Sequence, residues 1–394
     1  MDRTHRPFMA KLVRTVYTIG LGGFASEIFS SDGFNNVFCA VYDCGSNTHG
    51  MNTRIDSIIE HEIDRIDALF ISHFHRDHIN QIKKLPITKD TKVFIPWLFD
   101  RYILLKEYLW DMDYSSLVRW LQQNATVIFL DPIEVGNSQS AAIIEEYNPE
   151  DEQNQLVFAN FSDGQHIGHI LKICIPGFDW CYIPFHLQDC SVFDMFIKEA
   201  LKNGITTEDL EHFDVNKKTL VRRLSKIYKY ICKKQHNDGN LNFSSMLLAS
   251  RPADARRRYS CDMKYDIGHL SLFDKNDYNY WHQYYQDNAS CLYTGDTPLH
   301  INSFMSIFKL LMPKILNGET GLVQLPHHGS KNGYNPEIWR TTSSKNAFVH
   351  CAENPCKHQP SITPQIYFDI SRMGVNLFAV SEKDDTQFRE LIYL

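Results

Sequence analysis

Four side chains that can bind divalent metals occur within six residues of the sequence. His73, His75, Asp77 and His78 follow residues 67–71, an apolar run that is typical of a buried strand. Alternate side chains of an extended segment point the same way, so His73 and His75 are expected on one side. Imidazole and carboxylate groups suit zinc or manganese. A lone His-x-His is commonly a solvated loop, but the complete set indicates a metal-binding loop that can serve two ions.

Further candidate ligands lie much later in the chain. Asp296 follows a predicted strand in a Thr-Gly-Asp turn, where its carboxylate can bridge two metals. His327 and His328 follow another predicted strand, and His358 lies in the loop after a third. Layered sheet proteins build their sites at such strand ends. These residues are therefore expected to meet the loop that begins at His73.

The first part of the chain contains the elements that must position this loop. Strands are predicted at residues 12–19 and 37–42, and a helix at 55–63 leads into the strand at 67–71. Asp43 stands directly after the second strand, in a tight turn. Its carboxylate is expected to hydrogen-bond the neighbouring ligand loop.

The middle of the chain is less regular. Residues 137–154 are polar and predict a loop, and residues 157–175 predict a hairpin. Residues 216–234 form the clearest amphipathic helix, with Arg222 and Lys226 on a basic face. This face suits phosphate groups of a nucleotide or nucleic acid. In a chain of net charge −7, a merely solvated helix face is the competing interpretation.

Composition indicates an ordinary globular protein. Of 394 residues, 43% are hydrophobic and 22% are charged, which allows one well-filled core. The net charge of −7 argues against a surface devoted wholly to nucleic acid. Ten cysteines without a Cys-x-x-Cys pair predict reduced thiols and a cytoplasmic location, although a metal site of Cys351, Cys356 and His358 is conceivable. The most apolar run, residues 169–185, contains Lys172 and Asp179, so no membrane span is expected.

Taken in order, these motifs resemble the metallo-β-lactamase fold. The matching segments are Asp43-Cys44-Gly45, Ser72-His73-x-His75-x-Asp77-His78, Thr294-Gly295-Asp296 and His327-His328-Gly329-Ser330. The last segment, with the later His358-x-Pro360-Ser361, most resembles the branch containing the soluble hydrolase domain of the DNA-uptake protein ComEC. The resemblance covers about residues 12–96 and 240–380. No membrane portion like that of ComEC is expected in this chain, so the resemblance does not imply a role in transport.

The resemblance implies an α+β fold, a four-layer αββα sandwich formed as a single domain over residues 1–394. A largely helical insertion is expected at about 186–238. A second insertion, of loop character, is expected at about 250–288.

The resemblance also implies a role for each candidate residue. His73 and His75 would bind a first metal, Asp77 and His78 a second, and Asp296 would bridge the two. His328 would be the last ligand, and Asp43 would orient the loop. The expected substrate contacts are His327, His358 and Ser330. The basic face of the predicted helix adds Arg222 and Lys226 to the candidate substrate contacts.

One expected ligand has no clear counterpart. Many family members carry a third histidine for the first metal, in a His-x-x-Gly context that this chain lacks. ComEC-like members show Asn followed by Ser at the head of a strand, and Asn242 with Ser245 fits that pattern. His269 is the competitor. If Asn242 holds this place, the metal at His73 and His75 is expected to be the labile one.

The expected activity is hydrolysis by a metal-activated water, with two Zn²⁺ ions or Mn²⁺ in their place. Asp77 can accept a proton, and His327 or His358 can protonate the leaving group. The ComEC-like loop and the basic helix favour a phosphodiesterase or nuclease that acts on nucleic acid or nucleotides. The alternatives are hydrolysis of another ester-like bond, such as a lactone or thioester, and a catalytically weak binding or regulatory module. The sequence leaves open whether the protein binds a partner protein or forms a homo-oligomer.

Overall fold

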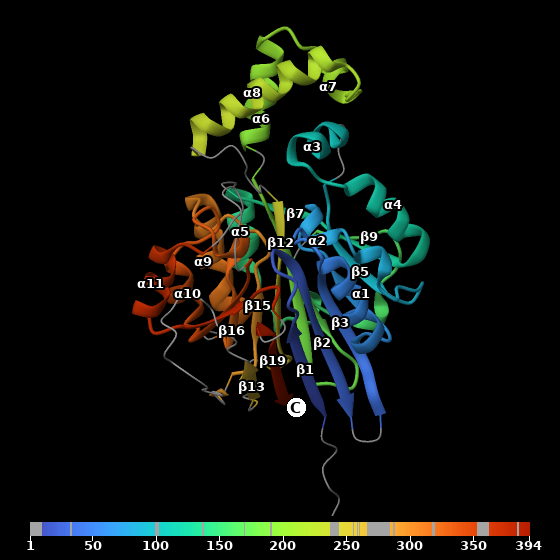
Figure 1. Ribbon diagram of the computed structural model, residues 1–394, viewed down its shortest axis with the longest axis vertical. Coiled ribbons are helices and arrows are strands. Elements are labelled where there is room, and N and C mark those ends of the chain that lie inside the picture. The colour runs from blue at the N-terminus through green and yellow to red at the C-terminus, as the bar shows by residue number, and fades with distance from the viewer. Residues whose placement is uncertain are drawn as a thin grey trace, which may run out of the picture.

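Two β-sheets pack face to face at the centre of the protein (Figure 1). The computed structural model describes residues 10–31, 34–98, 102–135, 138–168, 170–189, 191–236, 244–254, 256–257, 259, 261–265, 284–286, 288–316, 320–352, 362–383 and 386–394. Asn242, His269, Cys356 and His358 lie outside these residues.

The first sheet has ten described strands. Their spatial order is β14 (Tyr284–Gln286), β13 (Cys261–Tyr265), β19 (Phe388–Tyr393), β1 (Lys11–Val16), β2 (Gly22–Ser31), β3 (Phe34–Ser46), β4 (Ala68–Phe70), β5 (Lys92–Pro96), β6 (Thr126–Leu130) and β9 (Gln165–Ile167). The neighbouring strands β3, β4, β5, β6 and β9 run parallel, so their carboxyl ends lie at the same edge of the sheet.

The second sheet has nine described strands. Eight follow the order β18 (Asn376–Val380), β17 (Asn346–His350), β16 (Leu322–Gln324), β15 (Cys291–Tyr293), β12 (Ser244–Pro252), β11 (Trp180–Gln188), β10 (Lys172–Cys174) and β8 (Gln155–Val157), and β7 (Pro132–Glu134) pairs with β11. All residues of β11 and β12 are buried, as expected of strands covered on both faces.

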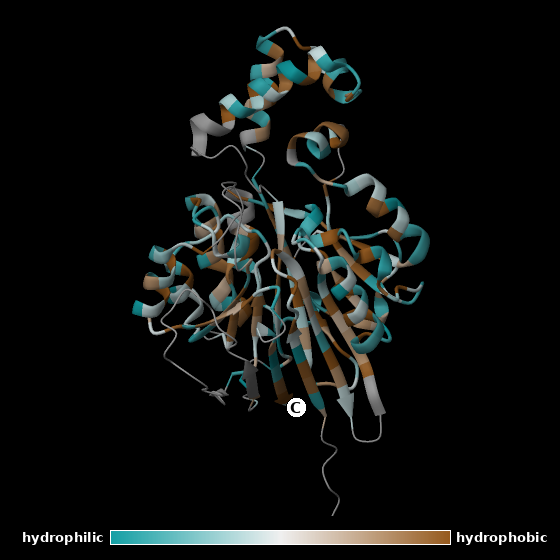
Figure 2. Cartoon of the chain, in the orientation of Figure 1, coloured by the Kyte–Doolittle hydropathy of each residue, from teal (hydrophilic) through white to brown (hydrophobic). Residues whose placement is uncertain are grey.

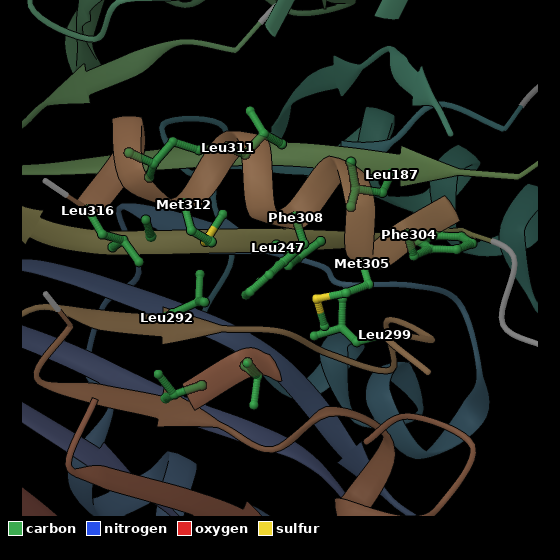
Figure 3. Close-up of a cluster of buried hydrophobic side chains, with 14 of the residues drawn as sticks. Leu187, Leu247, Leu292, Leu299, Phe304, Met305, Phe308, Leu311, Met312 and Leu316 are labelled. Atoms are coloured by element: carbon green, nitrogen blue, oxygen red, sulfur yellow. The ribbon is translucent and has the colours of Figure 1, made fainter. Parts of the chain in front are cut away.

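Helices cover the outer face of each sheet. On the first sheet lie α1 (Met51–Glu62), α2 (Arg76–Ile79) and α4 (Tyr114–Asn124), and on the second lie α5 (Ser138–Glu146), α9 (Asn302–Leu316), α10 (Glu337–Thr342) and α11 (Pro364–Arg372). The helix α3 (Ile103–Trp110) stands above the first sheet (Figure 1). In Figure 3, Phe308 and Met312 of α9 point toward Leu247 and Leu292 of the sheet. Four layers result, so the predicted αββα sandwich is confirmed.

A small helical cap, defined as α6 (Ser191–Lys202), α7 (Thr207–Glu211) and α8 (Lys218–His236), stands at one end of the sandwich (Figure 1). It falls within the insertion expected at about 186–238. The cap has its own apolar cluster, in which Phe196 and Leu224 pack with Leu105 of α3. Among the described residues, no helix is long and apolar enough to cross a membrane.

Two local predictions differ from the structure. The expected loop at 137–154 contains α5, and the expected hairpin at 157–175 does not form. Instead β9 pairs in parallel with β6, and β10 pairs with β11. The second expected insertion stays a prediction: within it, β13 and β14 are the outermost two strands at one edge of the first sheet, and residues 266–283 lie outside the described part.

A buried ionic cluster joins the two sheets. Arg14 of β1 is 0% exposed and contacts the carboxylates of Glu27 and Glu390. Tyr182 and Tyr293 of the second sheet donate hydrogen bonds of 2.8 and 3.0 Å to Glu27. Burial disfavours the charged guanidinium, but the two carboxylates outweigh it and raise the pKa of Arg14 well above its usual value. The cation therefore holds two buried anions in place.

We expect Arg14→Met to lower the free energy of unfolding by about 3–5 kcal/mol, because two buried carboxylates lose their cation. Urea denaturation measures the change. The matched control is Arg340→Met, since Arg340 is 71% exposed and pairs with Glu337 at 2.7 Å. That pair contributes below about 1 kcal/mol. Equal losses in the two variants would contradict the role of the buried cluster.

Candidate metal centre

The ligand loop leaves the sheet at the carboxyl end of β4. Residues 68–74 are fully buried, and His75 precedes the first turn of α2. The carbonyl of Ser72 accepts a 2.7 Å hydrogen bond from the backbone of Met246, in β12 of the other sheet. This bond brings the loop beside the ends of β15 and β16. Asp296 and His328 follow those strands, so the fold brings the distant candidate ligands together.

Two groups of side chains can each hold a metal ion. The first contains His73, His78 and Asp296, and the second contains Asp77, His78 and His328. In each group, the ligand atoms lie within 4.8 Å of one another. Because His78 belongs to both groups, the two sites are adjacent.

Asp296 lies between the two groups. Its Oδ2 atom is 3.5 Å from Nε2 of His73, while its Oδ1 atom is 3.4 Å from Nε2 of His78 and 3.9 Å from Nε2 of His328. The two oxygens of one carboxylate thus face different histidines. This is the arrangement that a carboxylate needs in order to bridge two cations.

His75 and His327 lie at the margin of these groups. The His75 ring is 4.7 Å from the His73 ring, between centroids, but within the described residues it joins neither group. Burial, followed by the neighbouring His73, lowers the pKa of His75 to about 4. Nε2 of His327 is 3.9 Å from Oδ2 of Asp296, and the side chain is 19% exposed. His327 therefore stands on the His73 side of the carboxylate, at the mouth of the site.

Asp43 fixes the orientation of the histidines on the ligand loop. Its Oδ1 accepts from the backbone N–H of Ser72 at 2.7 Å, and its Oδ2 accepts from the Ser72 hydroxyl at 2.6 Å and from Nδ1 of His78 at 2.8 Å. Since the only hydroxyl proton of Ser72 goes to Asp43, its oxygen accepts from Nδ1 of His73, 2.9 Å away. Both imidazoles are then protonated at Nδ1. Their Nε2 lone pairs point to Asp296.

His328 is oriented in the same way by a different group. Its Nδ1 donates to the carbonyl of His350 over 3.3 Å, so its Nε2 carries the lone pair. Sequence reasoning identified Asp43 but missed Ser72 and His350. The position of Ser72 directly before the ligands was a usable signal for the first, whereas nothing in the sequence pairs His350 with His328.

These atoms fit a divalent cation. Within the described part of the chain, the buried Nε2 atoms of His73, His78 and His328 have no hydrogen-bond partner. Buried polar atoms are nearly always paired, so three converging lone pairs indicate a missing positive partner. Nitrogen and carboxylate oxygen are ligands of Zn²⁺ and also of Mn²⁺.

The charges favour a cation as well. Burial raises the pKa of Asp296, but the neighbouring imidazoles, with His327 the largest, outweigh it and lower that pKa well below the usual value. Burial likewise opposes the anion of Asp77, and the nearby His328 and His78 outweigh it and lower the pKa of Asp77. Two ionised carboxylates therefore lie at the centre of the group of histidines.

Three non-glycine residues of the site have left-handed backbone conformations. Asp43, His327 and His328 have φ values of 55°, 50° and 55°. Such conformations cost free energy and are concentrated at functional sites. The surrounding packing holds the carboxylate and both imidazoles in these positions.

The remaining predicted contacts are spread more widely. Ser330 shares a 3.1 Å hydrogen bond with Nδ1 of His327. The buried hydroxyl of Ser245 lies beside Gly295, since a Cβ atom added there would be 2.8 Å from it. Arg222 and Lys226 lie on α8 in the cap, away from the ligand groups. Asn242, His269 and His358 are outside the described residues, so the third ligand of the first metal stays a prediction.

Gly23 makes room for the hydrogen bond between Asp43 and His78. A Cβ atom added to Gly23 would lie 2.6 Å from Nδ1 of His78 and 2.8 Å from Oδ2 of Asp43, closer than atoms pack. We expect Gly23→Ala to weaken zinc binding by about 10–100-fold, the usual effect of losing a partner of a ligand. Titration against a competing chelator measures the affinity.

The control for this prediction is Gly168→Ala, where the nearest atom to the added Cβ is 3.6 Å away. It should bind zinc as the wild type does, and circular dichroism should show both variants folded. Unchanged affinity in a folded Gly23→Ala protein would contradict the orienting role of the bond.

The part of the chain that contains the ligand loop is similar to a known protein family. Residues 36–169 match the family model of the "Metallo-beta-lactamase superfamily", a stretch that contains Asp43 and the ligand loop. No curated protein matches the sequence. Among solved structures, "Crystal structure of unliganded yeast PDE1" aligns with 11% sequence identity and a TM-score of 0.41, covering 97% of this chain and 100% of that one. That likeness is too low to carry an inference, so the family model is the informative result: over residues 36–169 the chain is similar to the metallo-β-lactamase superfamily.

Proposed function

We propose that the protein is a metal-dependent hydrolase of phosphodiester bonds. The observation that supports this most strongly is the placement of Asp296, whose two carboxylate oxygens face different sets of histidines. A pair of cations held in this way suits displacement at phosphorus, because it can stabilise both the attacking and the leaving oxygen.

The proposed ligands combine this geometry with the roles that the family resemblance implies, since His75 is included on the resemblance alone. His73, His75 and Asp296 would hold one cation, and Asp77, His78, Asp296 and His328 the other. When bound, the cations would supply Lewis acidity and lower the pKa of water. Zinc is the proposed metal, with manganese the alternative, and the ion at His73 and His75 is the more labile because it has fewer ligands.

The protein's own groups would handle the protons. Asp77 is held as an anion by His328 and can accept a proton at Oδ2, 3.4 Å from Nε2 of that histidine. His327 is anchored by Ser330 at Nδ1 and presents Nε2 at the mouth of the site. It is placed to protonate the leaving-group oxygen of a substrate. His358 is the second candidate for this role.

The choice of phosphodiester rests on two further observations. The His327-His328-Gly329-Ser330 segment resembles the ComEC-like branch, and the cap at the same end of the sandwich carries a basic helix. Lactone or thioester hydrolysis is the second candidate, since the ligand set alone suits any reaction that develops an oxyanion. A catalytically weak binding module is the third.

A substrate panel separates these candidates. With zinc or manganese, the wild type should hydrolyse a chromogenic bis-aryl phosphodiester, and DNA, RNA and cyclic nucleotides should be assayed beside a lactone and a thioester. Asp296→Ala should lower turnover by about a hundredfold or more and reduce bound metal, measured by elemental analysis. The matched control is His61→Ala, because His61 is exposed on α1 and, among the described residues, hydrogen-bonds only to Ser57. Turnover of the lactone or thioester alone would contradict the phosphodiester proposal, and no turnover at all would favour the binding module.

His327→Gln tests the proton donor. We expect kcat to fall by about 10²–10⁴-fold for a diester with a poor alkoxide leaving group. The loss should be much smaller for a nitrophenolate, which leaves without a proton, and bound metal should not change. The control Ser330→Ala keeps the imidazole and removes only its anchor, so its loss should be smaller. Equal losses for both leaving groups would contradict the role of His327.

A further inference from the structure

Positive charge is concentrated on one helix of the cap. The 19 residues of α8 read KTLVRRLSKIYKYICKKQH, with seven lysines or arginines and no aspartate or glutamate, although the whole chain has a net charge of −7. A helix face that is merely solvated usually mixes both signs of charge. Figure 2 shows hydrophilic and hydrophobic residues alternating along the cap helices, as an amphipathic helix requires.

The two faces of α8 have different surroundings. Leu224, Tyr228 and Ile231 are buried in the apolar cluster with α6 and α3. Another face is exposed and forms what we call the basic stripe: Lys218, Arg222, Lys226, Lys229 and Tyr230. These positions follow one another at helical spacing, so they line one side of the helix.

The basic stripe has no neutralising partner among the described residues. No carboxylate there lies within 4.0 Å of the charged nitrogens of its four cations. By contrast, other cap lysines are paired, such as Lys202 with Glu199 and Lys217 with Asp209. An unpaired row of like charges creates a positive potential that attracts an anionic partner.

The cap stands at the end of the sandwich that carries the metal centre. Its chain leaves β11 at Gln188 and returns into β12 at Ser244, and these two residues are paired across the strands. The next residue, Ser245, adjoins Gly295, directly before Asp296. The cap also packs against α3, and Met112, which follows α3, forms a β-bridge with His75 of the ligand loop. A ligand on the cap is therefore tethered near the ligand loop.

We propose that the basic stripe binds the backbone of a single-stranded polynucleotide, whose phosphodiester bonds the metal centre cleaves. This inference rests on the proposed function. From Lys218 to Lys229 the helix advances about 16 Å, at about 1.5 Å per residue. That distance spans roughly five phosphates at about 3.4 Å per nucleotide of a B-form strand. The phosphates of a free nucleotide cluster at one point and cannot engage such a row.

Tyr230 favours a single strand over a duplex. Its side chain is 58% exposed and lies one helical turn after Lys226, on the basic stripe. An exposed ring beside cations can stack an unpaired base, whereas the bases of a duplex are already stacked on one another. The stripe thus combines backbone attraction with a stacking surface.

The test measures binding of a fluorescent phosphorothioate 20-mer by anisotropy, with the metal-loaded full chain. Arg222→Gln/Lys226→Gln should bind the single strand about tenfold or more weakly at 100 mM salt. The slope of log K against log salt should fall in magnitude by about 1.4, the value for two lost contacts. The ratio of kcat/KM for an oligonucleotide to that for the bis-aryl diester should fall about tenfold as well.

The matched control is Lys345→Gln/Arg372→Gln, which removes the same charge. Both side chains are exposed, and neither lies on the cap. Lys345 stands directly before the start of β17, at the opposite end of that strand from His350, which contacts His328, and Arg372 is at the end of α11. This variant should bind and turn over substrate as the wild type does. Tyr230→Ala should weaken binding of the single strand about fivefold or more, and it should weaken binding of the duplex less.

The possible failures are distinguishable. If the wild type binds the 20-mer through the stripe but hydrolyses no phosphodiester, the proposed function fails and the stripe stands. If it hydrolyses the bis-aryl diester while Arg222→Gln/Lys226→Gln binds the 20-mer as the wild type does, the stripe is overturned and the function stands. Equal binding of polyglutamate and the 20-mer would also overturn the inference, since it would indicate an acidic protein partner.

Discussion

The candidate metal centre depends on one buried carboxylate. Asp43 accepts three hydrogen bonds from Ser72 and His78, and through the Ser72 hydroxyl it also determines the tautomer of His73. A histidine binds metal only through an unprotonated nitrogen, so the protonation of Nδ1 decides whether Nε2 is available. The cost of the left-handed backbone at Asp43 is offset because this one group sets two imidazoles at once.

The sandwich supplies the second requirement, which is that ligands from both sheets meet. The loop after β4 belongs to the first sheet, while Asp296 and His328 follow strands of the second. The backbone bond from Met246 to Ser72 fixes the sheets at the site, and the Arg14 cluster fixes them in the core. Any sliding between the sheets would separate Asp296 from the histidines that it faces. Rigidity of the core is therefore part of the chemistry.

The fold brings together several of the residues that the sequence singles out as candidate ligands, whereas some of the elements around them were predicted wrongly. His73 and Asp296 were recognisable because their side-chain chemistry and their positions after apolar strands are both local features. The hairpin expected at 157–175 was wrong because β9 pairs with β6, a distant strand that local alternation cannot identify. The role of His350 was equally invisible, since it depends on which atoms the fold brings within hydrogen-bond distance, whereas Ser72 stands directly before the ligands in the sequence.

The central claim is that Asp296 lies between two cations. The most direct measurement is anomalous diffraction at the zinc absorption edge from crystals of the zinc-loaded protein. The account predicts two peaks on opposite sides of Asp296, one beside His73 and one beside His78 and His328, with the peak at His73 the first to weaken on chelation. A single peak that Asp296 does not contact, or no peak at these histidines, would contradict it.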